Sequence, residues 1–156
     1  MPRYAESTHV PSDRSRSEIE RTLRRYGATA FAYGWQEGAA QLMFEMANRR
    51  IRFTLPLPDP DADEFRLTPS GKYERTAKGQ EEAHEQAVRQ RWRALALVIK
   101  AKLEAVEAGI STVEDEFLSH VALPAGGTVG EWMKPRLDEV YATGQMPALL
   151  PGGADG

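Results

Sequence analysis

The chain has 156 residues, of which 41% are hydrophobic and 28% are charged; its net charge is −3 and it contains no cysteine. This length predicts one domain, and the lack of cysteine excludes disulfides, thiolate metal sites and a cysteine nucleophile. The sequence has no run of about eighteen apolar residues and no apolar signal segment at its N-terminus, so we expect a cytoplasmic protein without a membrane span.

The charges are distributed unevenly along the chain. Residues 1–56 contain nine arginines and six acidic residues, whereas residues 111–156 contain two basic and seven acidic residues. Arginine favours two-pronged contacts with phosphate or carboxylate groups. A basic and an acidic half can bind nucleic acid on one face and a protein on another, or they can attract each other within one fold or across a homodimer.

The N-terminal region predicts a flexible arm followed by one helix. Residues 1–14 show no periodicity and contain two prolines, so we expect an extended arm there. Ser15 and Glu18 have the spacing of a capping box, and an apolar stripe follows until Gly27. The domain is therefore predicted to cover residues 15–150.

Three segments with alternating apolar residues follow and predict three strands. They are residues 28–35, 39–47 and 51–57, separated by short turns at 36–38 and 48–50. Such a pattern predicts an antiparallel meander with one buried face. In the second strand both faces carry apolar residues, so the sequence leaves open which of its faces is buried.

The second half of the chain is predicted to be helical. After a long polar loop at 58–76, apolar residues recur at helical spacing, which predicts a helix over 77–108 that ends at Gly109. Two shorter helices are predicted at 112–121 and 129–143. Their expected capping boxes are Ser111 with Glu114 and Thr128 with Glu131, and residues 151–156 are expected to form a disordered tail.

Together these elements predict an α+β fold in the order α-β-β-β-α-α-α. The three-stranded antiparallel meander is expected to pack on one long and two shorter helices. Trp35, Trp92 and Trp132 are the expected anchors of the core.

The sequence gives little support for an enzyme. The pairs Glu81 with His84 and Glu116 with His120 have helical spacing, but we interpret both as parts of solvated charged faces. The chain contains no G-x-S-x-G nucleophile motif and no phosphate-binding glycine loop. We therefore expect no catalytic residues, no metal and no cofactor.

Three stretches resemble an uncharacterised family of small proteins encoded by tailed phages and prophages. They are RSRSEIERTLRRYGATAFAYGW (14–35), RWRALALVIKAKLEAVEAGISTVEDEFL (91–118) and TVGEWMKPRLDEVY (128–141). The resemblance implies a protein that acts in a bacterial host cytoplasm, in DNA metabolism or against a host defence. No assigned activity and no site residue come with it.

These observations favour a non-enzymatic phage accessory protein that binds DNA, with single-stranded DNA as the favoured form. The expected contacts are arginines that hold phosphates and aromatic residues that stack on bases. The expected nucleic-acid-binding residues are Arg21, Arg24, Arg25, Arg49, Arg50, Arg52, Tyr33 and Trp35. The alternative is an inhibitor or adaptor that binds a host protein through the acidic C-terminal region, and a homo-oligomer is compatible with this role.

Overall fold

The computed structural model describes residues 3–146 and confirms the predicted α+β class and order of elements. The elements are α1 (Arg3–Arg25), β1 (Ala30–Gln36), β2 (Ala39–Met46), β3 (Arg49–Pro56), α2 (Asp63–Arg66), α3 (Ala77–Glu107), α4 (Val113–Glu116), the 3-10 turn η1 (Leu118–His120) and α5 (Val129–Thr143). The expected tail at 151–156 lies outside the described residues. None of the helices in the described part is long and apolar enough to cross a membrane.

Helix α1 begins earlier than the sequence predicts. Residues 3–14 are helical, so the expected extended arm is wrong over this range, and Ser15 lies inside the helix instead of capping it. Once a first turn has formed, each further residue adds a hydrogen bond at little extra cost. A helix that has already started can therefore continue through a Ser-x-x-Glu sequence, even though this sequence resembles a helix cap.

The three strands form one antiparallel sheet in the order β1-β2-β3. The turn between β2 and β3 consists of Ala47 and Asn48, whose φ angles of 51° and 61° are those of a type I′ hairpin turn. The expected turn at 48–50 is therefore displaced, and β3 already begins at Arg49. Since side chains alternate along a strand, Arg50 and Arg52 lie on the face opposite Ile51 and Phe53.

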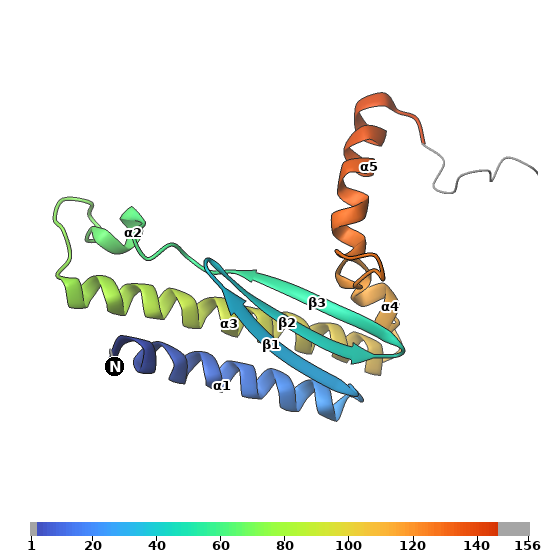
Figure 1. The fold of residues 1–156 in the computed structure, drawn as a ribbon, viewed down its shortest axis with the longest axis horizontal. Helices are drawn as coiled ribbons and strands as arrows, with labels where there is room; N and C mark the ends of the chain where they lie inside the picture. Colours follow the sequence, from blue (N-terminus) through green and yellow to red (C-terminus); the bar gives the residue numbers. More distant parts are fainter. Residues whose placement is uncertain (1–2, 147–156) are drawn as a thin grey trace, which may run out of the picture.

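The core lies between one face of the sheet and the two helices α1 and α3, which run side by side beneath it (Figure 1). The structure settles which face of β2 is buried, because its alternate residues Ala40, Leu42, Phe44 and Met46 are all inside. The predicted stripe of α3 is also buried at Val88, Trp92, Leu95, Ile99 and Leu103. The opposite face of the sheet is not part of this core.

Only one of the three tryptophans anchors the core. Trp92 is 2% exposed, whereas Trp35 is 65% and Trp132 41% exposed. Phe117, which follows α4, is fully buried instead, with ring centroids 5.4 Å from Phe44 and 6.0 Å from Phe53 in edge-on contacts. Trp35 is the next-to-last residue of β1, and Trp132 belongs to α5, which has no buried residue.

The expected polar loop at 58–76 is ordered against α3. It contains the single-turn helix α2, whose Phe65 is buried and lies 5.3 Å from the ring of His84. Arg66 bridges Asp63 at 2.9 Å and Glu74 at 2.8 Å, which ties the loop together.

Two of the predicted helix boundaries are confirmed and one is shifted. Gly109 has the predicted left-handed conformation, with a φ of 77°, just after the C-cap of α3. Thr128 and Glu131 form the predicted capping box of α5. The cap of α4 is Thr112 rather than Ser111, because the Thr112 side chain accepts a hydrogen bond from the backbone N–H of Asp115.

Helix α5 is the exception to the two-layer packing. It rises away from the sheet and the long helices (Figure 1), and none of its residues is buried. Its tertiary contacts concentrate on η1, and Gly130 sits close against Ser119 there. The base of α5 is therefore held firmly while the rest of the helix stands free.

We predict that Gly130→Ala destabilises the protein although alanine favours a helix by about 1 kcal/mol. A Cβ at position 130 would lie 2.9 Å from the backbone carbonyl oxygen of Ser119, which cannot move easily. Urea unfolding should show a net loss of about 1–2 kcal/mol. The control is Gly34→Ala in β1, where a Cβ meets nothing within 4 Å and stability should not fall.

Candidate nucleic-acid interface

The three predicted arginines of β3 are all paired with acidic side chains. Arg49 bonds Glu114 at 2.9 Å and Arg52 bonds Glu131 at 3.1 Å, which joins the basic N-terminal part to the acidic C-terminal part of the chain. Arg50 bonds Glu45 of the neighbouring strand at 3.2 Å. A phosphate would have to displace a carboxylate at each of these positions.

The two predicted aromatic residues, Tyr33 and Trp35, differ in their environments. Tyr33 is half-buried, with its ring centroid 5.5 Å from that of Trp92 and the Arg16 guanidinium 4.5 Å above it. Burial raises the pKa of the Tyr33 hydroxyl. Its ring is thus engaged in packing, and only Trp35 exposes a ring to solvent.

The predicted arginines of α1 divide between two sides of the helix. Arg24 bonds Glu20 at 3.2 Å, on the side that faces β1. Arg21 and Arg25 lie on the side that faces α3, where a depression of about 300 Å³ is lined by Glu18, Arg21, Thr22, Arg25 and Lys100. The structure therefore brings Arg21 and Arg25 together with a lysine that the sequence analysis did not select.

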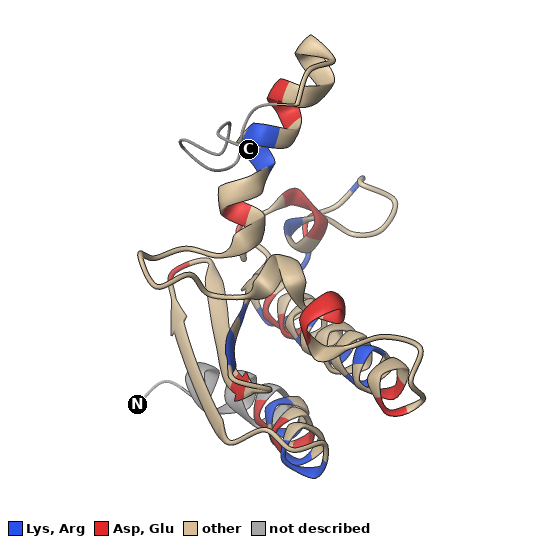
Figure 2. Cartoon of the chain, turned by 90° about the vertical axis from the view of Figure 1, so that its right-hand side faces the viewer, with Lys and Arg blue, Asp and Glu red and all other residues tan. Residues whose placement is uncertain are grey.

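Helical spacing places further cations in line with this depression along both helices. Arg14, Arg21 and Arg25 are separated by seven and four residues, and so are on one face of α1. Arg89, Arg93 and Lys100 are separated by four and seven residues, and so are on one face of α3. We call these six residues the basic groove: Arg14, Arg21, Arg25, Arg89, Arg93 and Lys100. Figure 2 shows basic segments on both helices.

The basic groove differs from the β3 arginines in its electrostatics. All six side chains belong to exposed residues, and within the described part of the chain none of them forms an ion pair. The guanidinium of Arg25 lies over the ring of Tyr26, 5.3 Å from the ring centroid. Glu18 is the acidic residue that lines the depression. By the same helical spacing, Glu82 and Glu107 lie on this face of α3, beyond the two ends of the row of cations. The groove is therefore a surface whose positive charge is available to a ligand.

The sequence contained a partial signal for this site. Arg89, Arg91 and Arg93 stand out as a cluster in the sequence. In a helix, however, residues two positions apart point to different sides, so Arg91 does not share a face with Arg89 and Arg93. Arg91 lies towards β3, where it donates a hydrogen bond to the carbonyl of Pro56 at 3.1 Å. Reading the cluster at helical spacing, from Arg89 to Arg93 to Lys100, would have identified this face of α3.

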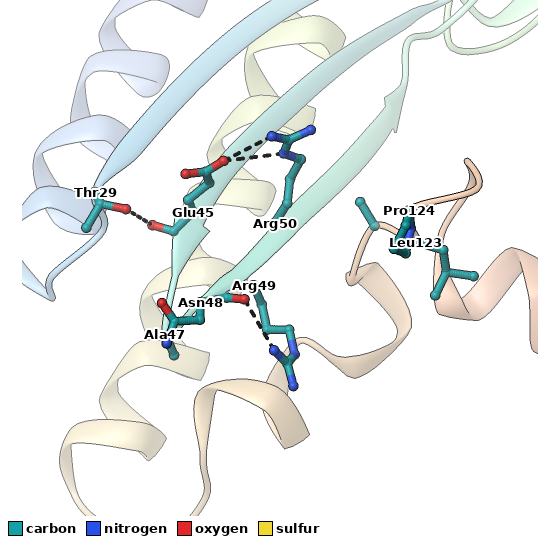
Figure 3. Close-up of a pocket in the computed structure, with 9 residues that line it drawn as sticks. Thr29, Glu45, Ala47, Asn48, Arg49, Arg50, Leu123 and Pro124 are labelled. Atoms are coloured by element: carbon teal, nitrogen blue, oxygen red, sulfur yellow. Dashed lines mark hydrogen bonds and ion pairs between the residues drawn. The ribbon is translucent and has the colours of Figure 1, made fainter.

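A second depression, of about 560 Å³, lies at the β2–β3 turn (Figure 3). The Arg50–Glu45 ion pair forms part of its wall, together with Thr29, Asn48 and the loop at 122–124. Arg50 bonds Glu45 within it, Arg49 bonds Glu114 outside it, and Thr29 donates to the Glu45 backbone carbonyl. The depression is polar but offers no unpaired charge for a phosphate.

The two histidine pairs considered for metal binding do not come together. His84 is buried, with its Nε2 2.9 Å from the carbonyl oxygen of Pro58, and His120 stacks on Phe53 with ring centroids 3.9 Å apart. Among residues 13–146, whose side chains the structure describes, no group of three or more His, Cys, Asp or Glu is arranged to hold a metal ion.

The environment of His120 predicts a pH dependence of stability. Burial lowers the pKa of this imidazole below its ordinary value, against a smaller opposing effect of the Arg52 backbone. The folded state therefore binds the proton less well than the unfolded state, and stability should fall as pH drops from about 7 through the ordinary histidine value towards the lowered one. Urea unfolding across this range should show a weaker pH dependence in His120→Asn.

Comparisons with protein-family models, with curated proteins and with solved structures found no match to this chain.

Proposed function

We propose that this protein binds the phosphate backbone of DNA through the basic groove. The observation that carries the proposal is the alignment of six exposed, unpaired cations along two adjacent helices. Release of condensed counterions by such cations supplies most of the affinity of sequence-independent DNA binding. The resemblance to phage proteins supports a role in phage DNA metabolism.

The length of the groove fits this ligand. Arg14 and Arg25 are eleven residues apart, which corresponds to about 17 Å along a helix. B-DNA rises about 3.4 Å along its axis per phosphate of one strand, so the groove matches the axial length of roughly five base pairs. Exposed Arg and Lys side chains at this spacing can follow a phosphate backbone without reading its bases.

The residues around the groove favour backbone contacts over base stacking. Tyr33 packs within the protein and Trp35 belongs to β1, whereas the cations belong to α1 and α3. We therefore expect similar binding of different sequences. The acidic C-terminal region gives weaker support for an adaptor role, because Glu114 and Glu131 are occupied by Arg49 and Arg52.

Fluorescence anisotropy with labelled single- and double-stranded oligonucleotides tests the proposal. We expect binding at about 50 mM salt that weakens steeply at about 200 mM salt, with a similar affinity for unrelated sequences. Absence of binding to both oligonucleotides at the lower salt concentration would refute the function. A strong preference for one sequence would refute the backbone mode.

A further inference from the structure

Helix α5 has an apolar face that the described chain covers only in part. Val129, Met133, Leu137, Val140 and Tyr141 recur at helical spacing and so form one stripe along it. Leu137 is 47% and Tyr141 87% exposed, and the helix contains no buried residue. A free helix of fifteen residues is only marginally stable in water without packing of its apolar face. This stripe needs a partner.

The charges beside the stripe are complementary between two copies of α5. Lys134 and Asp138 lie one turn apart on the same flank, and neither forms an ion pair among the described residues. If two copies of α5 lie antiparallel with the two-fold axis at the level of position 136, Lys134 of each copy faces Asp138 of the other. In a parallel pair the same flank of the two helices lies on opposite sides of the interface, so Lys134 and Asp138 of the two copies do not meet.

We infer that α5 is a homodimerisation helix, which pairs antiparallel with α5 of a second copy through this stripe. The same patch on both copies would form the interface, as in other two-fold dimers. The helix is about 22 Å long, so it buries less surface than the roughly 1,200 Å² of a stable standard interface. The dimer should therefore be reversible and concentration-dependent.

Sedimentation equilibrium without DNA tests this inference independently of the proposed function. The wild-type protein should pass from monomer to dimer between about 1 μM and about 1 mM. Leu137→Asp should remove the dimer over this range. A protein that stays monomeric throughout, or a dimer that survives Leu137→Asp, would overturn the inference.

A charge swap identifies the antiparallel arrangement. Lys134→Glu and Asp138→Lys should each weaken self-association at least about tenfold, because each places two like-charged pairs in the interface. An equimolar mixture of the two variants should recover dimers, since both pairs are then opposite in charge. Loss of a contact within one helix cannot be repaired by mixing. A mixture that associates no better than either variant alone would therefore contradict the antiparallel dimer, provided that circular dichroism shows both variants folded.

Discussion

Replacing Arg21, Arg25 and Lys100 together by glutamine is expected to weaken DNA binding on the order of a hundredfold at low salt. These three cations line one depression and have no carboxylate partner within the described chain. Each lost phosphate contact should also reduce the slope of log affinity against log salt concentration by about 1, so the triple variant should have a much flatter salt dependence. Anisotropy titrations at several salt concentrations measure both quantities.

Two further variants make this prediction specific to the groove. Arg24→Gln combined with Lys72→Gln and Lys78→Gln removes the same charge outside the groove and should leave binding close to wild type. Glu18→Gln removes the acidic residue of the depression and should strengthen binding severalfold, which a damaged fold cannot do. If the control triple weakened binding as much as the groove triple, net charge rather than the groove would explain the affinity.

The same titrations decide the role of the β3 arginines. Arg49, Arg50 and Arg52 were predicted from sequence to bind DNA, but each bonds a carboxylate in the folded chain. Their joint replacement by alanine should therefore affect stability more than the salt slope of DNA binding. If the joint replacement reduced the salt slope of DNA binding as much as the groove triple does, these three arginines would be part of the binding site.

Trp92→Ala is expected to lower the free energy of unfolding by about 3–5 kcal/mol, a large part of the roughly 5–15 kcal/mol of a typical domain. Trp92 is 2% exposed and packs between α3 and the sheet, with Tyr33 against its ring. The substitution would leave a large cavity in the core. Urea unfolding measures the change.

Trp35→Ala is the matched control for this substitution, since it removes the same atoms from a side chain that is 65% exposed. Its effect should stay within about 0.5 kcal/mol, the range typical of surface positions. Equal losses from the two variants would mean that Trp35 is covered in solution.

The sequence by itself determined the elements of this protein. The spacing of apolar residues in α3, the left-handed Gly109 and the capping box of Thr128 and Glu131 are local features, and each is formed as predicted. Such patterns depend on residues within one or two turns of each other, so they can be recognised before the fold is known. The start of α1 and the turn at Ala47 and Asn48 were misplaced, because element boundaries respond to weaker local preferences.

Only the tertiary structure decided which charges remain available. Arg49 and Glu114 are 65 residues apart and Arg52 and Glu131 are 79 apart, yet they neutralise each other in the fold. Arg21 and Lys100 come from different helices and meet only because α1 and α3 pack side by side. The sequence lists the cations, but the availability of each one depends on neighbours that the folded backbone brings within a few ångströms, where the Coulomb interaction is strong.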